Sequence, residues 1–471
     1  MLKLDYKQLI INSNFMSKFK HYNQNQIQLL PPNLSDLIEK DHIARLINQV
    51  IDQMDLSFIE NTYSVDGQHA YHPRMLFKIL VYGYTIGLRS SRKLADRLTE
   101  DIVFMWLSGR QTPDFRTIAN FRKDKLVDVK KAFTEVLSLC RQLGMIRIGK
   151  VCLDGTKIRA SANGSKMQYR KTLNKRKNRI EQQVNDILAE AEQIDREEEK
   201  LYGNNTERRT GIDINEVKRK LNKMKKRKET LGKNKKKLEA KKQDINGKLR
   251  KIRQDRNSMS STDKDATMML MKENYTAPGY NVHFATEHQV ILGYNVSSDR
   301  NDQKQLKPIV KEIKTNTGQK PKIIPADAGY GIKSNYRFLK NQRIAAFIPY
   351  NNFNKEMVER NKDVYELPKK IDLELERYKF RQRLRLLSPE GKKLMDRRKQ
   401  DIEPTIGDIK RNMNFRVFHL RGKPKCLTEI GLVSIGHNLK KIKSWVKKLA
   451  EWDDGNQKGQ ELGITLGYRP A

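Results

Sequence analysis

The chain has 471 residues, of which 95 are Lys or Arg and 56 are Asp or Glu, so its formal net charge is +39. This length predicts more than one domain, and a pI near 9.9 favours a polyanionic partner, nucleic acid before an anionic membrane. The three cysteines lie far apart without a Cys-x2-Cys pair, which argues against a disulfide framework or a thiolate zinc site. No apolar run approaches the roughly 18 residues of a membrane span, and no signal-peptide pattern opens the chain. We therefore expect an intracellular protein with no membrane partner.

Residues 1–140 are predicted to form a helical DNA-binding domain. Apolar residues recur there at helical spacing, and Asp114 can cap a short basic helix. Short helices joined by tight turns are typical of helix-turn-helix-like modules, so Arg116 and Arg122 are candidate DNA contacts. The alternative is an all-helical scaffold whose basic faces are simply solvated.

Residues 166–260 are predicted to form an antiparallel coiled-coil hairpin inserted into the next domain. Apolar residues follow a heptad pattern over 180–201, interrupted at Glu198, and again over 217–252. Lysines occupy three seam positions of the second run, Lys228, Lys235 and Lys242. Positions 211–256 hold 19 Lys and Arg against 6 Asp and Glu. The hairpin is therefore either a nucleic-acid arm or dimerisation device, or a self-paired hairpin with solvated lysines.

Residues 145–450 are predicted to form a mixed α/β catalytic domain around this insertion, and 451–471 a C-terminal tail. The segment 279–296 alternates as a β-hairpin that turns at Thr286–His288. One predicted strand ends at Asp154 before Gly155, and another ends at Asp327 before a glycine turn.

Three acidic residues stand at the ends or starts of predicted elements, namely Asp154, Asp327 and Glu403. Phosphodiester chemistry requires divalent metal held by hard oxygen ligands, and Mg²⁺ prefers carboxylates, water and substrate phosphate. Two such ions can activate a water or a 3′-hydroxyl and stabilise the leaving oxygen. Taken singly, each aspartate is also an ordinary turn residue, and Glu403 an ordinary exposed helix residue. Their order in a strongly basic chain favours a metal site.

At these residues the sequence resembles the DDE transposases of bacterial insertion sequences. The matching stretches are VCLDGTKI, IIPADAGY, RRKQDIEPTIGDIK and the helical block HPRMLFKILVYGYTIGLRSSRKLADRL. The resemblance covers residues 30–445 apart from the hairpin. It implies a ribonuclease H-like catalytic fold with Asp154, Asp327 and Glu403 as catalytic metal ligands, two Mg²⁺ ions for which Mn²⁺ can substitute, and cutting and joining at element ends.

Some relatives carry a Tyr-x2-Arg-x3-Glu-x6-Lys signature around the glutamate. Here Lys410 stands seven residues after Glu403, but Asp396 and Lys399 replace the tyrosine and the arginine. Residues seven apart lie near one face of a helix, so Glu403 could ligate metal while Lys410 meets phosphate. Pro404 predicts that the helix begins or kinks at Glu403. Lys157, Arg398 and Lys399 complete the candidate DNA contacts.

The sequence therefore predicts a transposase that binds the terminal inverted repeats of its element and target DNA, as a homodimer in the synaptic complex and associated with the bacterial nucleoid in the cytoplasm. No Walker A loop is present, and exchanging one phosphodiester for another requires no ATP. Two alternatives stay open: a metal-dependent nuclease without strand transfer, and a non-catalytic nucleic-acid-binding protein. The sequence does not specify the repeat sequence, the target preference or the excision intermediate.

Overall fold

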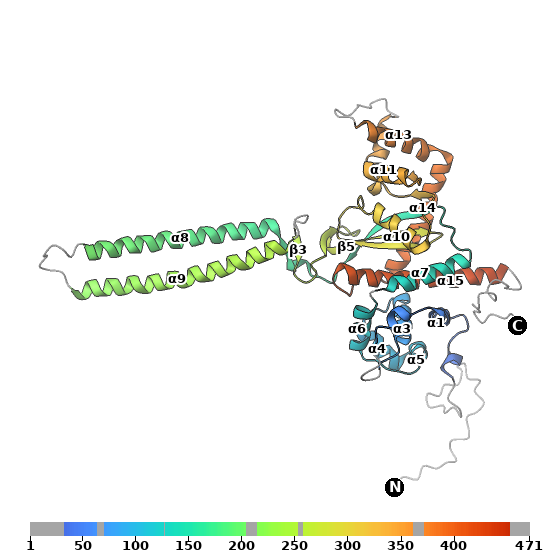
Figure 1. Ribbon diagram of the computed structural model, residues 1–471, viewed down its shortest axis with the longest axis horizontal. Helices are drawn as coiled ribbons and strands as arrows, with labels where there is room; N and C mark the ends of the chain where they lie inside the picture. The colour runs from blue at the N-terminus through green and yellow to red at the C-terminus, as the bar shows by residue number, and fades with distance from the viewer. Residues whose placement is uncertain are drawn as a thin grey trace, which may run out of the picture.

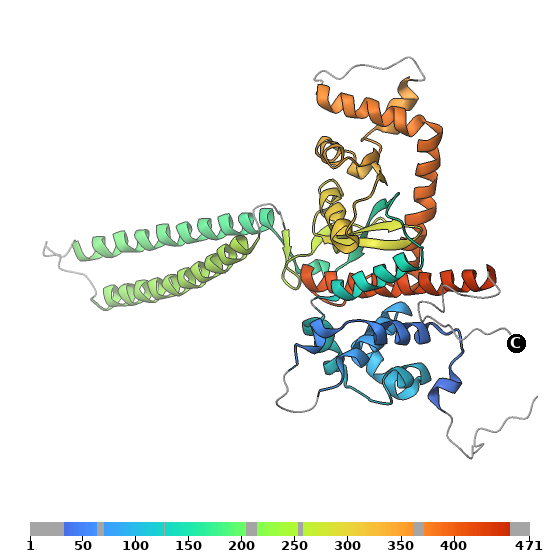
Figure 2. The ribbon, with the colours of Figure 1, turned by 45° about the vertical axis from the view of Figure 1, so that its right-hand side comes forward.

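The computed structural model describes residues 33–63, 70–126, 128–203, 214–252, 258–360 and 372–452. A helical N-terminal region lies below a mixed α/β region, and two long helices project far to one side (Figure 1, Figure 2). The link between the two heptad runs and nearly all of the predicted tail fall outside the described residues. In the described part of the chain, no helix has both the length and the apolar composition needed to cross a bilayer.

The N-terminal region is all-helical where it is described, as predicted. Asp114 caps α6 by accepting a hydrogen bond from the Thr117 amide at 2.7 Å. Its elements are η2 (Leu34–Leu37), α1 (Ile43–Gln53), α2 (Ser57–Glu60), α3 (Pro73–Thr85), α4 (Ser91–Glu100), α5 (Ile102–Leu107), α6 (Phe115–Asn120), the π-helical η3 (Phe121–Lys125) and α7 (Val129–Gln142). Their apolar faces join the same buried core as the sheet.

The mixed sheet combines an antiparallel half and a parallel half. Its strands are β1 (Cys152–Arg159), β4 (Thr267–Leu270), β5 (Thr276–Glu287), β6 (Val290–Ser297), β7 (Ile323–Pro325) and β8 (Ala345–Phe347). β5 pairs antiparallel with β1 on one edge and with β4 and β6 on the other. β7 pairs parallel with β8, and parallel bridges from Lys150 to Ile323 and from Leu153 to Ala326 join β7 to β1. The order across the sheet is therefore β6-β5-β1-β7-β8.

Two sequence predictions about this sheet are wrong in detail. β1 does not end at Asp154; it continues through Gly155 to Arg159. Gly155 is needed for close packing rather than for a turn, because a Cβ there would lie 2.9 Å from both Asp302 Oδ1 and His283 Cε1. The β5–β6 turn lies at His288–Gln289, two residues later than its predicted start, because the strand pairs continue past a register shift at Ala285/Thr286.

Helices flank the sheet and connect it to the N-terminal region. They are α10 (Leu306–Thr317), η6 (Ala328–Tyr330), α11 (Lys333–Asn341), α12 (Phe353–Arg360), α13 (Leu373–Leu387), α14 (Pro389–Gly407), the π-helical η7 (Asp408–Asn412) and α15 (Lys423–Trp452). α15 runs between the sheet and the N-terminal helices (Figure 2). The Asn438 side chain on α15 bonds both the N–H and the C=O of Ile291 in β6, each at 2.9 Å. The C-terminal helix therefore satisfies backbone groups on the outer edge of β6.

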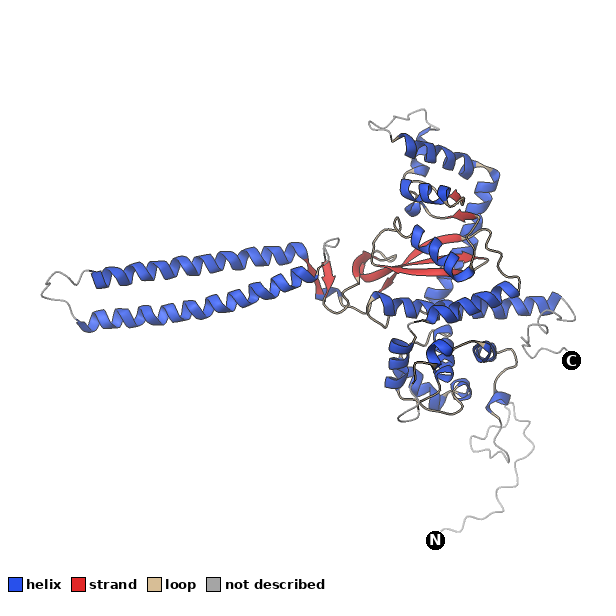
Figure 3. Cartoon of the chain, viewed as in Figure 1, coloured by secondary structure: helices blue, strands red, loops and turns tan. Residues whose placement is uncertain are grey.

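The projecting arm consists of α8 (Arg170–Gly203) and α9 (Ile214–Lys251), which lie side by side and antiparallel (Figure 3). It is inserted between β1 and β5. The chain enters and leaves the arm through a two-stranded ribbon, β2 (Met167–Tyr169) with β3 (Ser258–Ser260), after the short η4 (Gly164–Lys166).

Candidate active site

Asp154 lies in β1 opposite Phe284 of β5, with its carboxylate hydrogen-bonded to the Gly155 amide at 2.8 Å. The side chain is 23% exposed. Burial, with the nearby charges of Asp327 and Asp302, raises the pKa of the Asp154 carboxyl to about 6, against the lowering effects of Arg398 and the Gly155 amide. A carboxyl in this setting is a functional-site candidate, because it is held in a region of concentrated negative charge.

Asp327 follows β7, the strand beside β1. The bridge from Leu153 to Ala326 joins the residues that directly precede the two aspartates. Asp327 caps the short helix η6 by accepting a hydrogen bond from the Ala328 amide at 2.7 Å. The prediction of a strand, a carboxylate and a glycine turn is confirmed here. Because Leu153 and Ala326 pair across neighbouring parallel strands, the two aspartates that follow them come from adjacent positions.

Glu403 lies on α14, which begins at Pro389 with Ser388 as its cap and contains Pro404. Of the two predicted alternatives, a helix that begins at Glu403 is wrong, since Ser388 accepts a hydrogen bond from the Gly391 amide at 3.0 Å and caps the helix there, and Pro404 lies inside it. Pro404 has no N–H to donate to the Gln400 carbonyl. That carbonyl accepts a hydrogen bond from the Gln289 side chain at 3.0 Å, which compensates for the proline.

Arg398 connects the two ends of the predicted site. Its side chain is 11% exposed and lies with Nη1 3.6 Å from Asp154 Oδ2 and Nη2 3.9 Å from Glu403 Oε1. The Nε and Nη1 atoms are buried without a hydrogen-bond partner. One guanidinium therefore lies within ion-pairing distance of two of the three predicted acids, and it retains donors that form no hydrogen bond in this structure.

The predicted three-carboxylate cluster is not preformed. Among the described residues, no three His, Cys, Asp or Glu side chains are arranged so that they could hold a metal ion. The guanidinium of Arg398 lies between Asp154 and Glu403, and the Glu403 side chain is 56% exposed. The donors themselves fit a divalent cation, because carboxylate oxygens are the ligands that Mg²⁺ prefers and Asp154 lies within the field of a second aspartate.

Asp302 is a further acid at this site that the sequence analysis missed. It accepts a hydrogen bond from Asn281 Nδ2 at 2.6 Å and lies 3.7 Å from His283 Nε2. Burial raises the pKa of Asp302, as does Asp327. The side chain packs against Gly155 and Gly329, where any Cβ would lie within 3.0 Å of its carboxylate oxygens. No motif marks this residue, but the glycines that follow both aspartates are the signal of its close approach.

His283 lies beneath these acids and is fully buried. Burial lowers the pKa of its imidazole to about 3, so the ring is neutral. Its Nδ1 is 2.6 Å from the hydroxyl of Tyr330, which is also buried. The acids therefore lie on a rigid, uncharged support.

Two of the predicted basic contacts lie beside Asp154. Lys410 Nζ donates to the Lys157 carbonyl at 3.1 Å, and burial lowers the pKa of Lys410 while Asp154 acts to raise it. The charge of Lys157 acts on Asp302. Both lysines thus lie within the electrostatic reach of the site's acids.

The other basic candidates lie in different settings. Lys399 is 64% exposed beside Asp396, and both line an open cavity of about 670 Å³ together with Asp327. Arg116 is exposed and stacks on Phe115 at 5.7 Å.

Arg122 is 5% exposed and takes part in the internal packing of the helical region. Its guanidinium donates to the Tyr84 hydroxyl at 3.2 Å and to the Arg89 carbonyl at 2.7 Å. Tyr84 in turn donates to Glu429 of α15 at 2.6 Å. Arg122 therefore helps to fasten the N-terminal helices to α15, and we leave it out of the DNA surface proposed below.

Two family models match the chain. Residues 32–124 match a Transposase domain (DUF772), and residues 258–439 match a Transposase DDE domain. The second match contains Asp327 and Glu403 but begins after Asp154. No curated protein and no solved structure matches at a significant level.

A DDE transposase domain implies a ribonuclease H-like fold, and the mixed sheet with its adjacent aspartates agrees with that implication. The N-terminal match falls on the all-helical region that the structure describes. The chain belongs to the DDE-type transposases of insertion elements.

Proposed function

We propose that this transposase binds the ends of its element and carries out metal-dependent strand cleavage and strand transfer at a site formed by Asp154, Asp327 and Glu403. The main support is the position of Arg398, whose one guanidinium lies within 3.9 Å of both Asp154 and Glu403. The charge of Asp327 also acts on Asp154. Arg398 thus connects Asp154 to Glu403, and charge connects Asp154 to Asp327, which supports a site shared by the three acids.

Mg²⁺, or Mn²⁺ in its place, would be held by these three acids and would lower the pKa of a bound water or 3′-hydroxyl while neutralising charge on the leaving oxygen. The chain's own residues orient the reaction. The Gly155 and Ala328 amides fix the carboxylates of Asp154 and Asp327. Lys157, Lys399, Lys410 and Arg398 supply positive charge for phosphate oxygens. Arg398 is the best placed of these to move from carboxylate to phosphate.

The other parts of the chain receive separate roles. Residues 1–140 would recognise the terminal inverted repeats with exposed cations such as Arg116. The two-helix insertion, 166–260, would form a coiled coil, and 145–450 the catalytic domain around it. Because two element ends are joined in one reaction, we propose a homodimer in the synaptic complex, acting in the cytoplasm at the nucleoid.

The test is strand cleavage of a duplex carrying the inverted repeat that flanks the coding region, with Mg²⁺ present. Asp154→Asn and Asp327→Asn are each expected to cut at least about 100-fold more slowly, since they remove ligand charge from the reacting centre. DNA binding should remain. Glu390→Gln, an exposed substitution on the helix of Glu403, should cut normally and serves as the control for Glu403→Gln.

Normal cutting by both aspartate variants would refute the assigned site. Strand-transfer products on a supercoiled target would separate a transposase reaction from simple nuclease action, because a nuclease leaves the freed 3′-hydroxyl unjoined.

A further inference from the structure

The tip of the β5–β6 hairpin has an unusual backbone. His288 and Gln289 connect Glu287 to Val290, and their φ angles are 53° and 65°. Two-residue hairpins of this kind require positive φ at both central positions, which normally selects Asn and Gly. Neither residue is of that type, so contacts from outside the hairpin must stabilise the tip.

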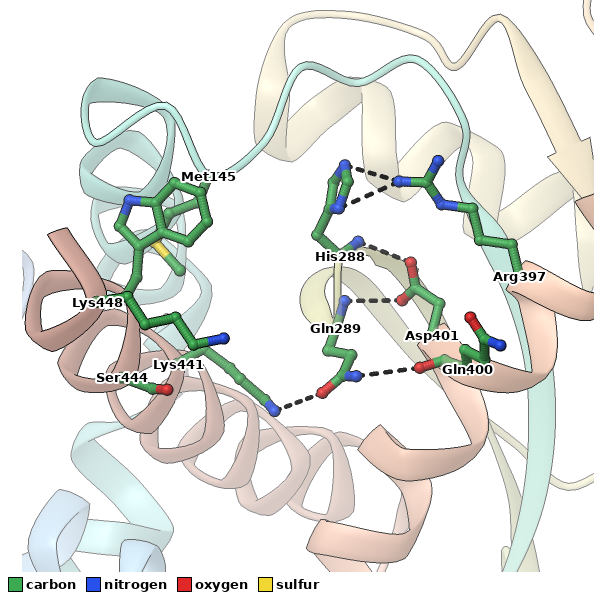
Figure 4. A pocket seen from close by; sticks show the side chains of 10 residues that line it. Met145, His288, Gln289, Arg397, Gln400, Asp401, Lys441, Ser444 and Lys448 are labelled. Carbon is green, nitrogen blue, oxygen red and sulfur yellow. Dashed lines mark hydrogen bonds between the residues drawn. The ribbon is translucent and has the colours of Figure 1, made fainter. Parts of the chain in front are cut away.

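Those contacts come from α14. Asp401 accepts hydrogen bonds from the His288 amide at 2.7 Å and the Gln289 amide at 2.8 Å, which occupies both of its carboxylate oxygens (Figure 4). The Gln289 side chain donates to the Gln400 carbonyl, as shown in the same view. The tip is therefore held in a fixed position against the helix that carries Glu403.

This tip forms one wall of an open cavity of about 380 Å³. Arg397 of α14 and Met145 contribute further walls. Gln400 and Asp401 of α14 also line it, and the other lining residues lie on α15, at Lys441, Ser444, Trp445 and Lys448. Their spacing of three, four and seven residues places them on one face of that helix. The cavity thus lies between two helices and a rigid turn.

The charge in this cavity is unbalanced. Arg397, Lys441 and Lys448 form no ion pair with an acid in the described part of the chain, so three cations share this cavity with one carboxylate, that of Asp401, whose two oxygens accept the tip amides. Lys441 Nζ donates to the neutral Gln289 side chain at 2.6 Å, and Arg397 lies 3.2 Å from the His288 ring. Burial lowers the pKa of Lys441, as do the charges of Lys440 and Lys448, whereas Asp408 and Asp401 act to raise it. An anion here would relieve the repulsion among these cations.

We propose that this cavity binds a backbone phosphate of the DNA that lies across the active site. The proposal rests on the proposed function, because it places the same DNA at both sites. His288 is four residues beyond Phe284, the partner of Asp154 in β5, so the tip lies about 13 Å along the sheet from that aspartate. A strand held at the acids can therefore place a flanking phosphate in the cavity. Arg397 offers it a planar pair of donors, and Lys441 and Lys448 offer point charges.

The first experiment measures binding of the full-length protein to the inverted-repeat duplex over a range of salt concentrations. The double variant Lys441→Gln, Lys448→Gln is expected to bind about 10-fold more weakly at low salt, with a salt slope reduced by about 0.9 for each phosphate that is no longer neutralised. Lys443→Gln combined with Lys447→Gln is the matched control, because it also removes two positive charges from α15, on a side that lines a different cavity. Thermal unfolding of each variant shows whether it is folded. Equal binding by the double variant and the wild type would overturn the proposal.

The second experiment locates the phosphate. A single uncharged methylphosphonate is moved along the duplex, and the wild type should lose affinity at one or two positions flanking the cleavage point. The double variant should show no further loss at those positions. An equal loss in both proteins at every position would contradict a phosphate site in this cavity.

A third measurement separates DNA from free phosphate as the source of the anion. If inorganic phosphate raises the melting temperature of the wild type but not of the double variant, while their DNA affinities are equal, the cavity binds free phosphate and the proposal is wrong. The phosphate site is judged from DNA binding alone. Normal cleavage by Asp154→Asn would therefore undermine the proposed function without altering the binding result, so the two failures can be told apart.

Discussion

The catalytic body and the two-helix arm of this transposase are stabilised by different interactions. In the body, one continuous core joins side chains from the N-terminal helices, the sheet and α15. The arm has a small cluster of buried residues near its base, Leu173, Ile245, Ile252 and Met259. Along most of its length its residues are exposed or partly exposed. The body is therefore specified by contacts between distant segments, and the arm by neighbouring turns and paired charges.

Three of the four charged residues at the predicted seam positions of the arm form ion pairs between its two helices. Lys228 of α9 pairs with both Asp195 and Glu198 of α8, so two of these seam residues meet each other. Lys242 pairs with Glu181 at 3.0 Å farther along. Charge pairs at seam positions fix the register of two helices at the expense of stability. Charge pairs in the arm therefore set the alignment of its two helices, whereas the apolar core of the body provides its stability.

The largest loss of stability is expected when a substitution creates a cavity in the core of the body. Phe133 of α7 is fully buried and packs edge-on against Tyr294 of β6, with ring centroids 5.0 Å apart. Phe133→Ala is expected to lower the free energy of unfolding by about 3–5 kcal/mol, measured by denaturant titration. Leu188→Ala, at a 39% exposed position of α8, should change it by under about 0.5 kcal/mol. Similar losses from both variants would remove the contrast.

An intermediate change in the free energy of unfolding is expected when pH changes the protonation of Asp154. Because the folded protein raises the Asp154 pKa from 3.8 to about 6, it binds that proton more tightly than the unfolded chain. This stabilisation is complete below about pH 4 and is lost as pH rises through 6, so the free energy of unfolding should fall by about 3 kcal/mol in the presence of chelator. Asp154→Asn removes the titrating group. Its stability, measured at the same pH values, should lack this fall; parallel profiles for the two proteins would contradict the interpretation.

The smallest effect should come from the arm. Lys228→Gln removes a cation that pairs with Asp195 and Glu198, and hydrogen exchange should become faster at amides around those positions while the body stays unchanged. The charge swap Lys228→Glu with Glu198→Lys should restore part of the protection. Faster exchange in the sheet would show that the two regions are coupled.

The sequence predicted the elements of the site better than their surroundings. Asp327 and the turn after it are predicted from a local pattern, and in the structure Asp327 caps the short helix η6 that contains Gly329. An Asp-Gly pair usually forms a turn, so the sequence predicts a turn at Gly155. In the structure, the space that a Gly155 side chain would fill is occupied by Asp302, from a distant segment. Asp302 itself has no local signal, since only the folded sheet brings it to Asn281 and His283. Contacts over long sequence distances explain each of these differences.

The exposure of the basic residues is likewise not predicted by the local sequence. Arg122 and Arg116 lie on neighbouring turns of one short basic segment, and nothing local distinguishes them. One is buried by a tyrosine from α3 and the other is exposed. Whether a cation faces a partner or the interior is decided by packing, which a single sequence expresses only weakly.

The ribbon at the base of the arm has a consequence for how this protein can change. Met167 pairs with Ser260, so the two points where the arm joins the body are adjacent. One turn can then be added to or removed from both α8 and α9 beyond that junction, and the register between β1 and β5 stays the same. A shorter loop grafted across the ribbon would yield a miniature enzyme in which the contribution of the arm can be measured directly.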